Sequence, residues 1–382
     1  MLHAVTNVPR DYAWGDTELI ARLQGREPSG KPEAEVWFGD HPGDPADLAD
    51  GRDLRAVTGG SLPYLLKLLA AGSPLSIQVH PNLQQAREGF AREAHLEADD
   101  PTRNYRDDNH KPELIVALSD SFEALCGLRP LEDTRRILSA LPQTPGVQAL
   151  AAVLNGNDPV RAALRWVLAE ASESEVASVH EALASADLEQ WDAPDAADVV
   201  ALRSIAAHYP GDRGVIVALM MNRVVLSRGE GLFLGAGNVH AYLSGLGVEI
   251  MSASDNVLRG GLTPKRIDVD ELLSIVDPTP LHVDVQDAES AAVQVYRIPV
   301  DDFALRRITV GEQKHTVMVH APAMVLATAG SVVVSGNDGV EHPVAVGTAV
   351  MADGDETELV LSGSGEVFIA EPGGAVRLGI DG

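Results

Sequence analysis

The clearest indication of the fold lies in one short stretch, Leu75-Ser76-Ile77-Gln78-Val79-His80-Pro81. Successive side chains of a β-strand point to opposite faces, so the apolar residues fall on one face and Ser76, Gln78 and His80 on the other. The apolar face suits a protein core, whereas the polar face places an amide beside an imidazole. Taken alone, that polar face fits a metal site and ordinary hydrogen-bonded sheet decoration equally well.

Further strand-like runs surround this stretch up to about residue 130. They alternate with turns, as in Glu35-Val36-Trp37-Phe38-Gly39. One helix is predicted to begin at Pro81-Asn82 and to run towards Glu93, because proline suits the first helical position. The amino-terminal third of the chain is therefore expected to be mainly β-sheet.

Between about Leu131 and His208 the apolar residues recur at helical spacing instead. One apolar helix face follows Asp158-Pro159 and contains Val160, Leu164, Val167 and Leu168, and another contains Val199, Leu202 and Ile205. Strand character returns at Gly214 and persists to the end, in short runs separated by Gly and Pro. The sequence thus predicts a mainly β protein with an inserted α-helical domain between jelly-roll or barrel sheets.

Composition restricts the class of protein and its partners. The 382 residues are too many for one ordinary core, and 45% apolar with 22% charged residues is typical of a folded globular chain. The 29 basic and 56 acidic residues give a formal net charge of −27, which repels phosphate backbones, so no nucleic-acid partner is expected. A single cysteine, Cys126, with no membrane span and no leader segment, predicts a cytoplasmic protein.

A second polar stretch, Asp107-Asp108-Asn109-His110-Lys111-Pro112-Glu113, leads into an apolar strand predicted over 114–118. Lys111 and Glu113 are two residues apart at the entrance to that strand, so both can project into one cavity. A surface ion pair explains the same spacing.

A third stretch, Gly235-Ala236-Gly237-Asn238-Val239-His240-Ala241-Tyr242, is followed by Gly247-Val248-Glu249-Ile250-Met251. Its glycines permit a tight turn, after which His240 and Tyr242 share a strand face. Together with Gln78, His80 and Glu113, the His240 imidazole completes a possible set of four metal ligands. Zn²⁺, Fe²⁺ and Mn²⁺ all accept such nitrogen and oxygen donors, so the ligand types leave the metal open.

The fourth stretch is Ser254-Asp255-Asn256-Val257-Leu258-Arg259-Gly260-Gly261-Leu262-Thr263-Pro264-Lys265. In so acidic a chain, Arg259 and Lys265 beside paired glycines form the cationic island that an anionic substrate requires. An exposed turn with incidental basic residues is the alternative.

These four stretches, in this order, resemble the type I mannose-6-phosphate isomerases (phosphomannose isomerases), a metal-dependent branch of the cupin superfamily. The resemblance extends to residues 12–15, 34–42, 62–67, 122–127 and 209–212. It implies a catalytic cupin jelly roll built from residues 1–130 and 213–276, a helical insert over 131–212, and a carboxy-terminal jelly roll over 277–382 with a structural or dimer-forming role. A monomer or weak homo-oligomer is expected.

The resemblance also implies one Zn²⁺ per chain, held by Gln78, His80, Glu113 and His240. The residues that would line the substrate pocket are Ser76, Lys111, Tyr242, Glu249, Asp255, Arg259 and Lys265. The implied reaction interconverts D-mannose 6-phosphate and D-fructose 6-phosphate by moving a proton between C1 and C2 through an enediol(ate).

Within that reaction, zinc, Arg259 and Lys111 are expected to stabilise the developing negative charge, because a well-placed cation lowers such a barrier. Lys265 and Arg259, with Ser76, are expected to bind the phosphate. Glu249 and Asp255 are the candidate general bases; the alternative is that they hold Arg259 and Lys265 by ion pairing.

Trp14 and Trp37 also lie in matched stretches and are interpreted as packing or pocket wall, with His41 as a structural turn residue. Two other functions stay open at this point. One is an Fe(II) cupin oxygenase, and the other is a metal-stabilised sugar-phosphate binding protein without turnover.

Overall fold

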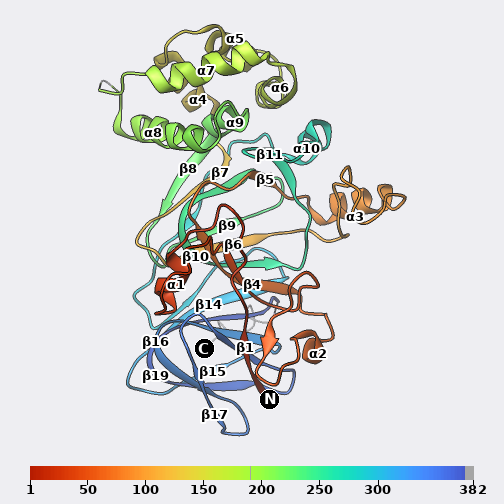
Figure 1. The fold of residues 1–382 in the computed structure, drawn as a ribbon, viewed down its shortest axis with the longest axis vertical. Helices are drawn as coiled ribbons and strands as arrows, with labels where there is room; N and C mark the ends of the chain where they lie inside the picture. The colour runs from red at the N-terminus through yellow and green to blue at the C-terminus, as the bar shows by residue number, and fades with distance from the viewer. Residues whose placement is uncertain (190, 375–382) are drawn as a thin grey trace.

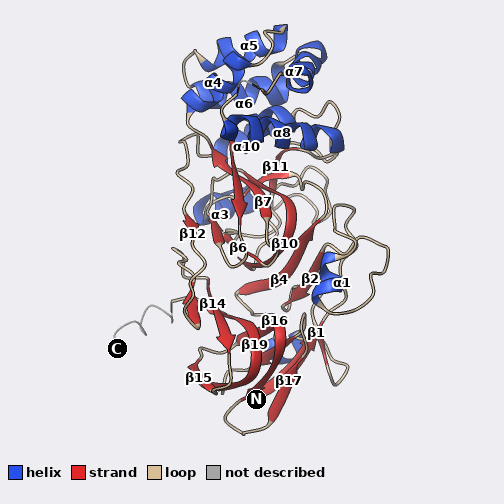
Figure 2. Ribbon diagram, turned by 90° about the vertical axis from the view of Figure 1, so that its left-hand side faces the viewer, coloured by secondary structure: helices blue, strands red, loops and turns tan. Residues whose placement is uncertain are grey.

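The computed structural model describes residues 1–189 and 191–374. These residues form three tiers, seen most directly in Figure 1: a helical unit at one end, a ten-stranded sheet in the middle and a nine-stranded sheet at the other end. Figure 2 shows that the helices of the upper tier gather on one side of the middle sheet only. The predicted mainly β fold with an inserted helical unit is confirmed.

The middle tier, called the central sheet below, consists of antiparallel strands. They are β2 (Glu35–Phe38), β4 (Tyr64–Ala71), β5 (Ile77–Val79), β6 (Glu113–Ala117), β7 (Phe122–Leu128), β8 (Met221–Leu226), β9 (Gly231–Leu234), β10 (His240–Ser252), β11 (Leu258–Gly261) and β12 (Val285–Gln286). The strands predicted around residues 35–39, 75–80 and 114–118 are therefore present.

Strand β10 closes the central sheet around a hollow. Its first residues pair with β5 and β7, and its later residues pair with β4 and β6. The strand changes partners at Gly245, which has φ of 117° and packs against the backbone of Phe122. A side chain there would meet Phe122 Cα at 2.9 Å, so glycine allows the bend that brings His240 and Glu249 to the same hollow.

Alternation along the strands separates core from hollow. On β4, β6 and β10 the residues facing the nine-stranded sheet are apolar and join one buried cluster, which includes Leu66, Leu68, Leu114, Val116, Val248 and Ile250. The residues that alternate with these apolar ones point the other way, and they include Lys67, Glu113 and Glu249, which line the hollow. Because successive side chains of a strand point to opposite faces, the charged groups lie in the hollow and the apolar groups lie in the core between the two sheets.

The nine-stranded sheet, called the carboxy-terminal sheet below, also contains two strands from the start of the chain. Its members are β1 (Leu2–Thr6), β3 (Asp47–Leu48), β13 (Val293–Val295), β14 (Phe303–Val310), β15 (His315–Met318), β16 (Ala323–Ser335), β17 (Glu341–Val344), β18 (Ala349–Ala352) and β19 (Glu358–Pro372). Because β1 pairs with both β18 and β3, this sheet contains strands from outside residues 277–382. The division of the chain into domains at residues 130, 212 and 276 stays a prediction.

The helices of the helical unit run from Leu131 to Leu219, and the predicted insert covers residues 131–212. It contains α4 (Leu131–Ala140), α5 (Pro145–Leu154), α6 (Pro159–Arg165), a π-helical turn (Trp166–Glu170), α7 (Glu173–Ser185), α8 (Ala193–His208) and α9 (Gly214–Leu219). Leu164, Val167, Val199, Leu202 and Ile205 are buried, which confirms the core of both predicted apolar faces. The same cluster includes Ile77 and Val79, so the unit packs on the outer face of β5.

Four further helices lie outside that unit: α1 (Leu19–Leu23), α2 (Arg55–Thr58), α3 (Leu83–Arg92) and α10 (Val269–Ile275). Helix α3 begins after Asn82 because that residue forms a capping box with Gln85. Among the described residues, none of the helices combines the length and the apolar character that a membrane crossing requires.

Candidate metal centre

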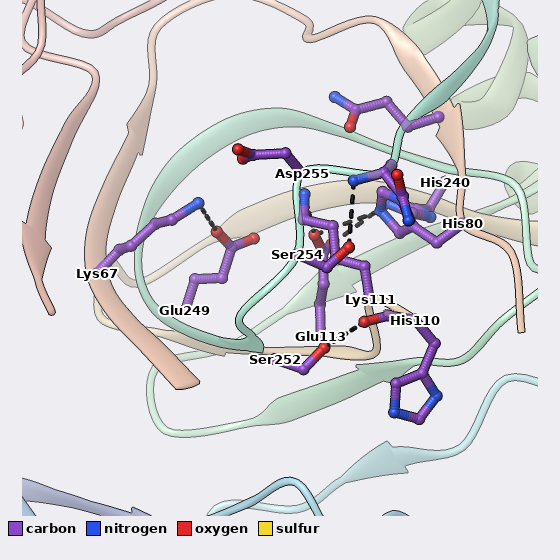
Figure 3. Close-up of polar contacts among 12 residues, drawn as sticks. Lys67, His80, His110, Lys111, Glu113, His240, Glu249, Ser252, Ser254 and Asp255 are labelled. Carbon is purple, nitrogen blue, oxygen red and sulfur yellow. Dashed lines mark hydrogen bonds and ion pairs between the residues drawn. The ribbon is translucent and has the colours of Figure 1, made fainter. Parts of the chain in front are cut away.

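Three buried side chains from distant strands meet in the central sheet. His80 Nε2 lies 3.3 Å from Glu113 Oε1, and His240 Nε2 lies 3.3 Å from Glu113 Oε2. One potential ligand atom from each residue lies within 4.8 Å of those of the other two. Figure 3 shows the two imidazoles and the carboxylate directed towards one centre.

Backbone carbonyls hold both imidazoles in this orientation. His80 Nδ1 lies 2.7 Å from the carbonyl oxygen of Asn256, and His240 Nδ1 lies 2.9 Å from that of Asn238. A carbonyl accepts only, so each Nδ1 carries a proton, and each Nε2 is turned towards the centre. Metal-binding histidines in proteins are typically fixed in this way.

His80 supplies the best evidence that this group suits a metal. Its side chain is fully buried, yet Nε2 has no hydrogen-bond partner in the part of the chain that the structure describes. Burial lowers the pKa of His80 to about 4, so its imidazole is neutral near pH 7. A neutral, buried, unpartnered imidazole nitrogen is the state that a divalent ion requires.

Glu113 complements the imidazoles by staying ionised. Burial opposes its charge, but its pKa is held well below the ordinary value, and the largest contribution in that direction is the charge of Lys111, whose Nζ lies 2.9 Å from Oε1. Two imidazoles and one carboxylate form a donor set that Zn²⁺ accepts.

Gln78 lies beside this group. It is the strand partner of His240, so the two side chains share a sheet face, and it lines the same cavity as Glu113. Its amide also donates to the Ser76 hydroxyl at 3.4 Å. Three of the four predicted ligands, Gln78, Glu113 and His240, therefore line one cavity, and His80 lies 3.3 Å from Glu113 beside it. The role of Gln78 as a ligand stays a prediction.

The cavity encloses about 350 Å³ of empty space, including its open mouth. It contains Ser76, Lys111, Tyr242 and Glu249, all four predicted to line a substrate pocket. The other lining residues are Glu35, Lys67, Leu69, Leu75, Gln78, Glu113, His240 and Ala241. Asp255, Arg259 and Lys265, which were predicted with them, are not in its wall.

Glu249 is the second buried carboxylate of the cavity. Its Oε2 lies 3.0 Å from Lys67 Nζ, and its Oε1 accepts a hydrogen bond from the Tyr242 hydroxyl at 2.9 Å. Burial raises the pKa of Glu249 above its ordinary value despite the opposing charge of Lys67. For Lys67, burial lowers the pKa, but the surrounding carboxylates outweigh burial and raise it. An acid and a cation thus face the metal centre together.

Lys67 and Glu35 were missed by sequence reasoning. Lys67 is the single charged residue inside β4, Glu35 is the first residue of β2, and Lys67 Nζ lies 3.8 Å from Glu35 Oε1. A charge in the middle of an apolar strand is rarely buried without a partner, so the pattern itself was the available indication.

Asp255 occupies a different position from Glu249. Its Oδ2 lies 3.0 Å from His41 Nε2, and its side chain is 53% exposed. The alternative that Glu249 and Asp255 pair with Arg259 and Lys265 is wrong, because their partners are Lys67 and His41 instead. The predicted turn role of His41 agrees with the hydrogen bond that its Nδ1 accepts from Gly43 N, at 3.1 Å.

Arg259 stands next to the cavity in the strand register. Arg259 on β11 pairs with Gln78 on β5, which pairs in turn with His240 on β10, so the three side chains lie in one row. Burial lowers the pKa of Arg259, with a contribution from the charge of Arg106. Arg259 in turn lowers the pKa of Lys265, again with a contribution from Arg106.

These three residues form a cationic island beside the cavity, and Arg106 was not predicted as part of it. Mutual repulsion among cations is relieved by an anion, so the island suits a phosphate. Arg106 precedes the second polar stretch, and the effect of its charge on Arg259, more than a hundred residues away in sequence, leaves no local mark in the sequence.

The two tryptophans differ in place. Trp37 lies edge-on to His41 at 5.0 Å between ring centroids, Lys67 Nζ lies 5.4 Å from its ring, and it packs with Leu65 and Met251. Trp14 stacks on Tyr12 at 5.7 Å and packs against the buried cluster around Phe122. The interpretation as packing or wall is confirmed for both.

A larger hollow, with about 1500 Å³ of empty space including its open mouth, lies between the central and the carboxy-terminal sheets. Its wall includes Cys126, Phe233, Tyr296 and Phe303, and none of the predicted site residues. Size alone therefore does not locate the site. Burial raises the pKa of Cys126 to about 12, which keeps the thiol protonated and unreactive.

Comparison with known proteins was made at three levels. Residues 2–131 match the family model "Phosphomannose isomerase type I, catalytic domain". A mannose-6-phosphate isomerase of Salmonella typhimurium is 34% identical over 96% of this chain and 98% of its own length, and one of Rattus norvegicus is 32% identical over 79% and 81%. A zinc-bound crystal structure of mannose 6-phosphate isomerase has a TM-score of 0.85 at 32% identity, covering 97% of this chain and 99% of that one.

Proposed function

The chain belongs to the mannose-6-phosphate isomerase family, and its activity is the zinc-dependent interconversion of D-mannose 6-phosphate and D-fructose 6-phosphate; from this premise, we propose which of its own side chains carry out each step. The Fe(II) oxygenase and the binding protein without turnover are not favoured, because the relatives are named mannose-6-phosphate isomerases and two of the similar structures are zinc-bound.

For the metal, we propose His80, Glu113, His240 and Gln78 as the protein ligands. The unpartnered Nε2 of His80 and the ionised carboxylate of Glu113 support this assignment. When bound, Zn²⁺ supplies positive charge close to oxygen atoms on which negative charge develops. Lys111, paired with Glu113 at 2.9 Å, adds a second cation at the same place.

For the phosphate, we propose Arg259 and Lys265, helped by Arg106 and by the hydroxyl of Ser76. The phosphate takes no part in the proton transfer, but holding it orients the reacting end of the sugar. Since Arg259 shares a face with Gln78 and His240, a sugar phosphate bound at the island reaches the metal cavity with C1 and C2 foremost.

For the proton transfer, we propose Glu249 as the general base rather than Asp255. Glu249 is buried, lines the metal cavity and has a raised pKa, which brings it closer to the pH at which a base works efficiently. Lys67 and Tyr242 hold its two oxygens, so it takes the proton from one carbon and returns it to the other on the same face. Lys111 and Arg259 stabilise the enediolate.

Asp255 is proposed as a rim residue of the substrate pocket. Its contact with His41 joins the loop after β10 to the turn after β2, and both lie beside Trp37. It therefore shapes the entrance without touching the reacting carbons.

The single observation that carries this assignment is the convergence of His80, Glu113 and His240 within 4.8 Å. An enzyme-coupled assay with mannose 6-phosphate tests it. We expect fructose 6-phosphate formation that a chelator abolishes and added Zn²⁺ restores, with His240→Ala losing zinc and turnover together. Full turnover in a metal-free protein, or a fully metallated and active His240→Ala, would contradict the assignment.

We further propose that the partner is a small sugar phosphate only, in a cytoplasmic monomer or weak homo-oligomer. The net charge of −27 disfavours nucleic acid, and the single cysteine suits a reducing compartment.

A further inference from the structure

The loop that leads into β6 carries His110, and its side chain points away from the metal cavity. Along His110-Lys111-Pro112-Glu113 the side chains alternate, so Lys111 and Glu113 enter the cavity. Figure 3 shows the imidazole of His110 on the other side, well apart from the His80 and His240 rings.

The imidazole of His110 contacts the carboxy-terminal sheet. Its Nε2 lies 2.8 Å from Oδ1 of Asp302, and each side chain is only 19% exposed. Asp302 directly precedes β14, whose first residue, Phe303, pairs with Pro372 and is buried in the core shared by the two sheets. Asp302 is therefore fixed by the carboxy-terminal sheet.

The backbone of the same loop is held from the central sheet. The carbonyl of His110 accepts a hydrogen bond from the hydroxyl of Ser252 at 2.6 Å, and Ser252 N donates to the carbonyl of Pro112 at 3.2 Å. Ser252 is fully buried at the end of β10. The residues that lead into β6 are thus held by hydrogen bonds to Ser252 of β10 and by the contact of His110 with Asp302.

We propose that Asp302 is a positioning residue for the metal centre. By holding His110, it fixes the strand entrance on which Lys111 and Glu113 stand one and three residues later. The carboxy-terminal sheet would then set the geometry of the reaction while contributing no described side chain to the wall of the cavity. The inference rests on the proposed function, since it takes Glu113 as a zinc ligand and Lys111 as a stabilising cation.

The expected size of the effect follows from positioning. A displacement of about 1 Å in a catalytic group costs roughly 100-fold in rate. Substrate affinity should change less, because Arg259 and Lys265 stand on and after β11, which Asp302 does not touch.

The test uses the full-length, zinc-loaded enzyme. Asp302→Ala is expected to lower kcat about 10- to 100-fold while KM for mannose 6-phosphate stays within about threefold. Asp302→Asn keeps an oxygen acceptor for His110 and is expected within about threefold of wild type. The matched control is Asp353→Ala, because Asp353 makes a similar contact, 3.2 Å from His3, at the far end of the carboxy-terminal sheet.

A second readout separates positioning from support of the fold. With Co²⁺ in place of Zn²⁺, the visible absorption of the metal reports its ligand geometry. We expect Asp302→Ala to change this spectrum and Asp353→Ala to leave it unchanged. A purely structural role would lower thermal stability but leave the spectrum and the kcat of the folded enzyme unaltered.

An Asp302→Ala enzyme with kcat within twofold of wild type and an unchanged cobalt spectrum would overturn the proposal. If that variant does not fold, His110→Ala removes the same contact from the loop side and decides the question; failure of both to fold would also contradict a positioning role. Should the wild type itself not convert mannose 6-phosphate, the proposed function fails, and the cobalt spectrum still tests the positioning.

Discussion

At the scale of single residues, the chemistry of the site depends on which of its buried side chains are charged and which are neutral. His80 is neutral and Glu113 ionised, although both are buried, because their neighbours differ. These two and His240 could be predicted from sequence, since strand alternation decides which residues share a face. The pairing of Asp255 with His41 could not, because 214 residues separate the two and neither has a local pattern that points to the other.

The assignment of Glu249 as general base predicts a particular pH dependence. A base works in its ionised form, so activity is present above its pKa and is lost as the pH falls through it. Because burial raises the pKa of Glu249, the loss should begin above the ordinary glutamate value of about 4.3. Lys67 opposes this shift, so Lys67→Met should move the acid limb of kcat to higher pH.

The pH profile of kcat tests this prediction. The control is Lys31→Met, at an exposed position, which should leave the acid limb of kcat at the same pH. An acid limb that Lys67→Met leaves at the same pH would show that another group is the base.

The cationic island gives a second prediction at this scale. Arg259→Ala is expected to lower kcat/KM about 100-fold or more, since it removes a cation proposed to meet both the phosphate and the enediolate. Zinc content and thermal stability should stay at wild-type values, because Arg259 makes no ion pair with any of residues 1–189 or 191–374. Near-normal kcat/KM in a folded, metallated Arg259→Ala would remove it from the mechanism.

At the scale of elements, the strand pattern predicted where the strands lie but not how they bend. The runs around residues 77 and 114 were recognisable because their apolar and polar residues alternate. The course of β10 was not, because its change of partners depends on the contact of Gly245 with Phe122, more than a hundred residues away. The helical insert was predictable, since Val199, Leu202 and Ile205 recur at helical spacing along α8.

The bulge that ends β11 offers a prediction about an element. Gly261 has φ of +137°, and an added Cβ would meet the Cα of Gly214 at 2.3 Å. Gly261→Ala should therefore lower the free energy of unfolding by roughly 1–3 kcal/mol or more and shift the register that places Arg259 beside Gln78.

Chemical denaturation measures this change. The control is Gly354→Ala, where no atom lies within 4 Å of the added Cβ, and where a change of about 0.5 kcal/mol or less is expected. Equal effects of the two substitutions would show that the contact between Gly214 and Gly261 does not constrain β11.

At the scale of the whole molecule, the two sheets share one core. Phe303 and Phe368 of the carboxy-terminal sheet lie in the same buried cluster as Leu66 and Ile250 of the central sheet. Strands β1 and β3 cross from the start of the chain into the carboxy-terminal sheet, and Figure 1 shows β1 there near the N-terminus. Their course could not be predicted, because pairing between chain ends leaves no local pattern.

This shared core predicts that the sheets unfold together. Phe368→Ala should lower the free energy of unfolding by about 3–5 kcal/mol. The urea midpoint followed by tryptophan fluorescence should fall with it, although the tryptophans lie outside the carboxy-terminal sheet. The exposed Val340→Ala should leave that midpoint in place. An unchanged fluorescence midpoint in Phe368→Ala would show two independent units.

The central claim is that four side chains hold one zinc ion beside a cationic island that binds phosphate. Anomalous diffraction at the zinc edge, from a crystal of this protein grown with mannose 6-phosphate, tests it most directly. The account predicts a single zinc peak among Gln78, His80, Glu113 and His240, with the phosphate on Arg259 and Lys265. A zinc peak elsewhere, or a phosphate bound away from these two cations, would contradict it.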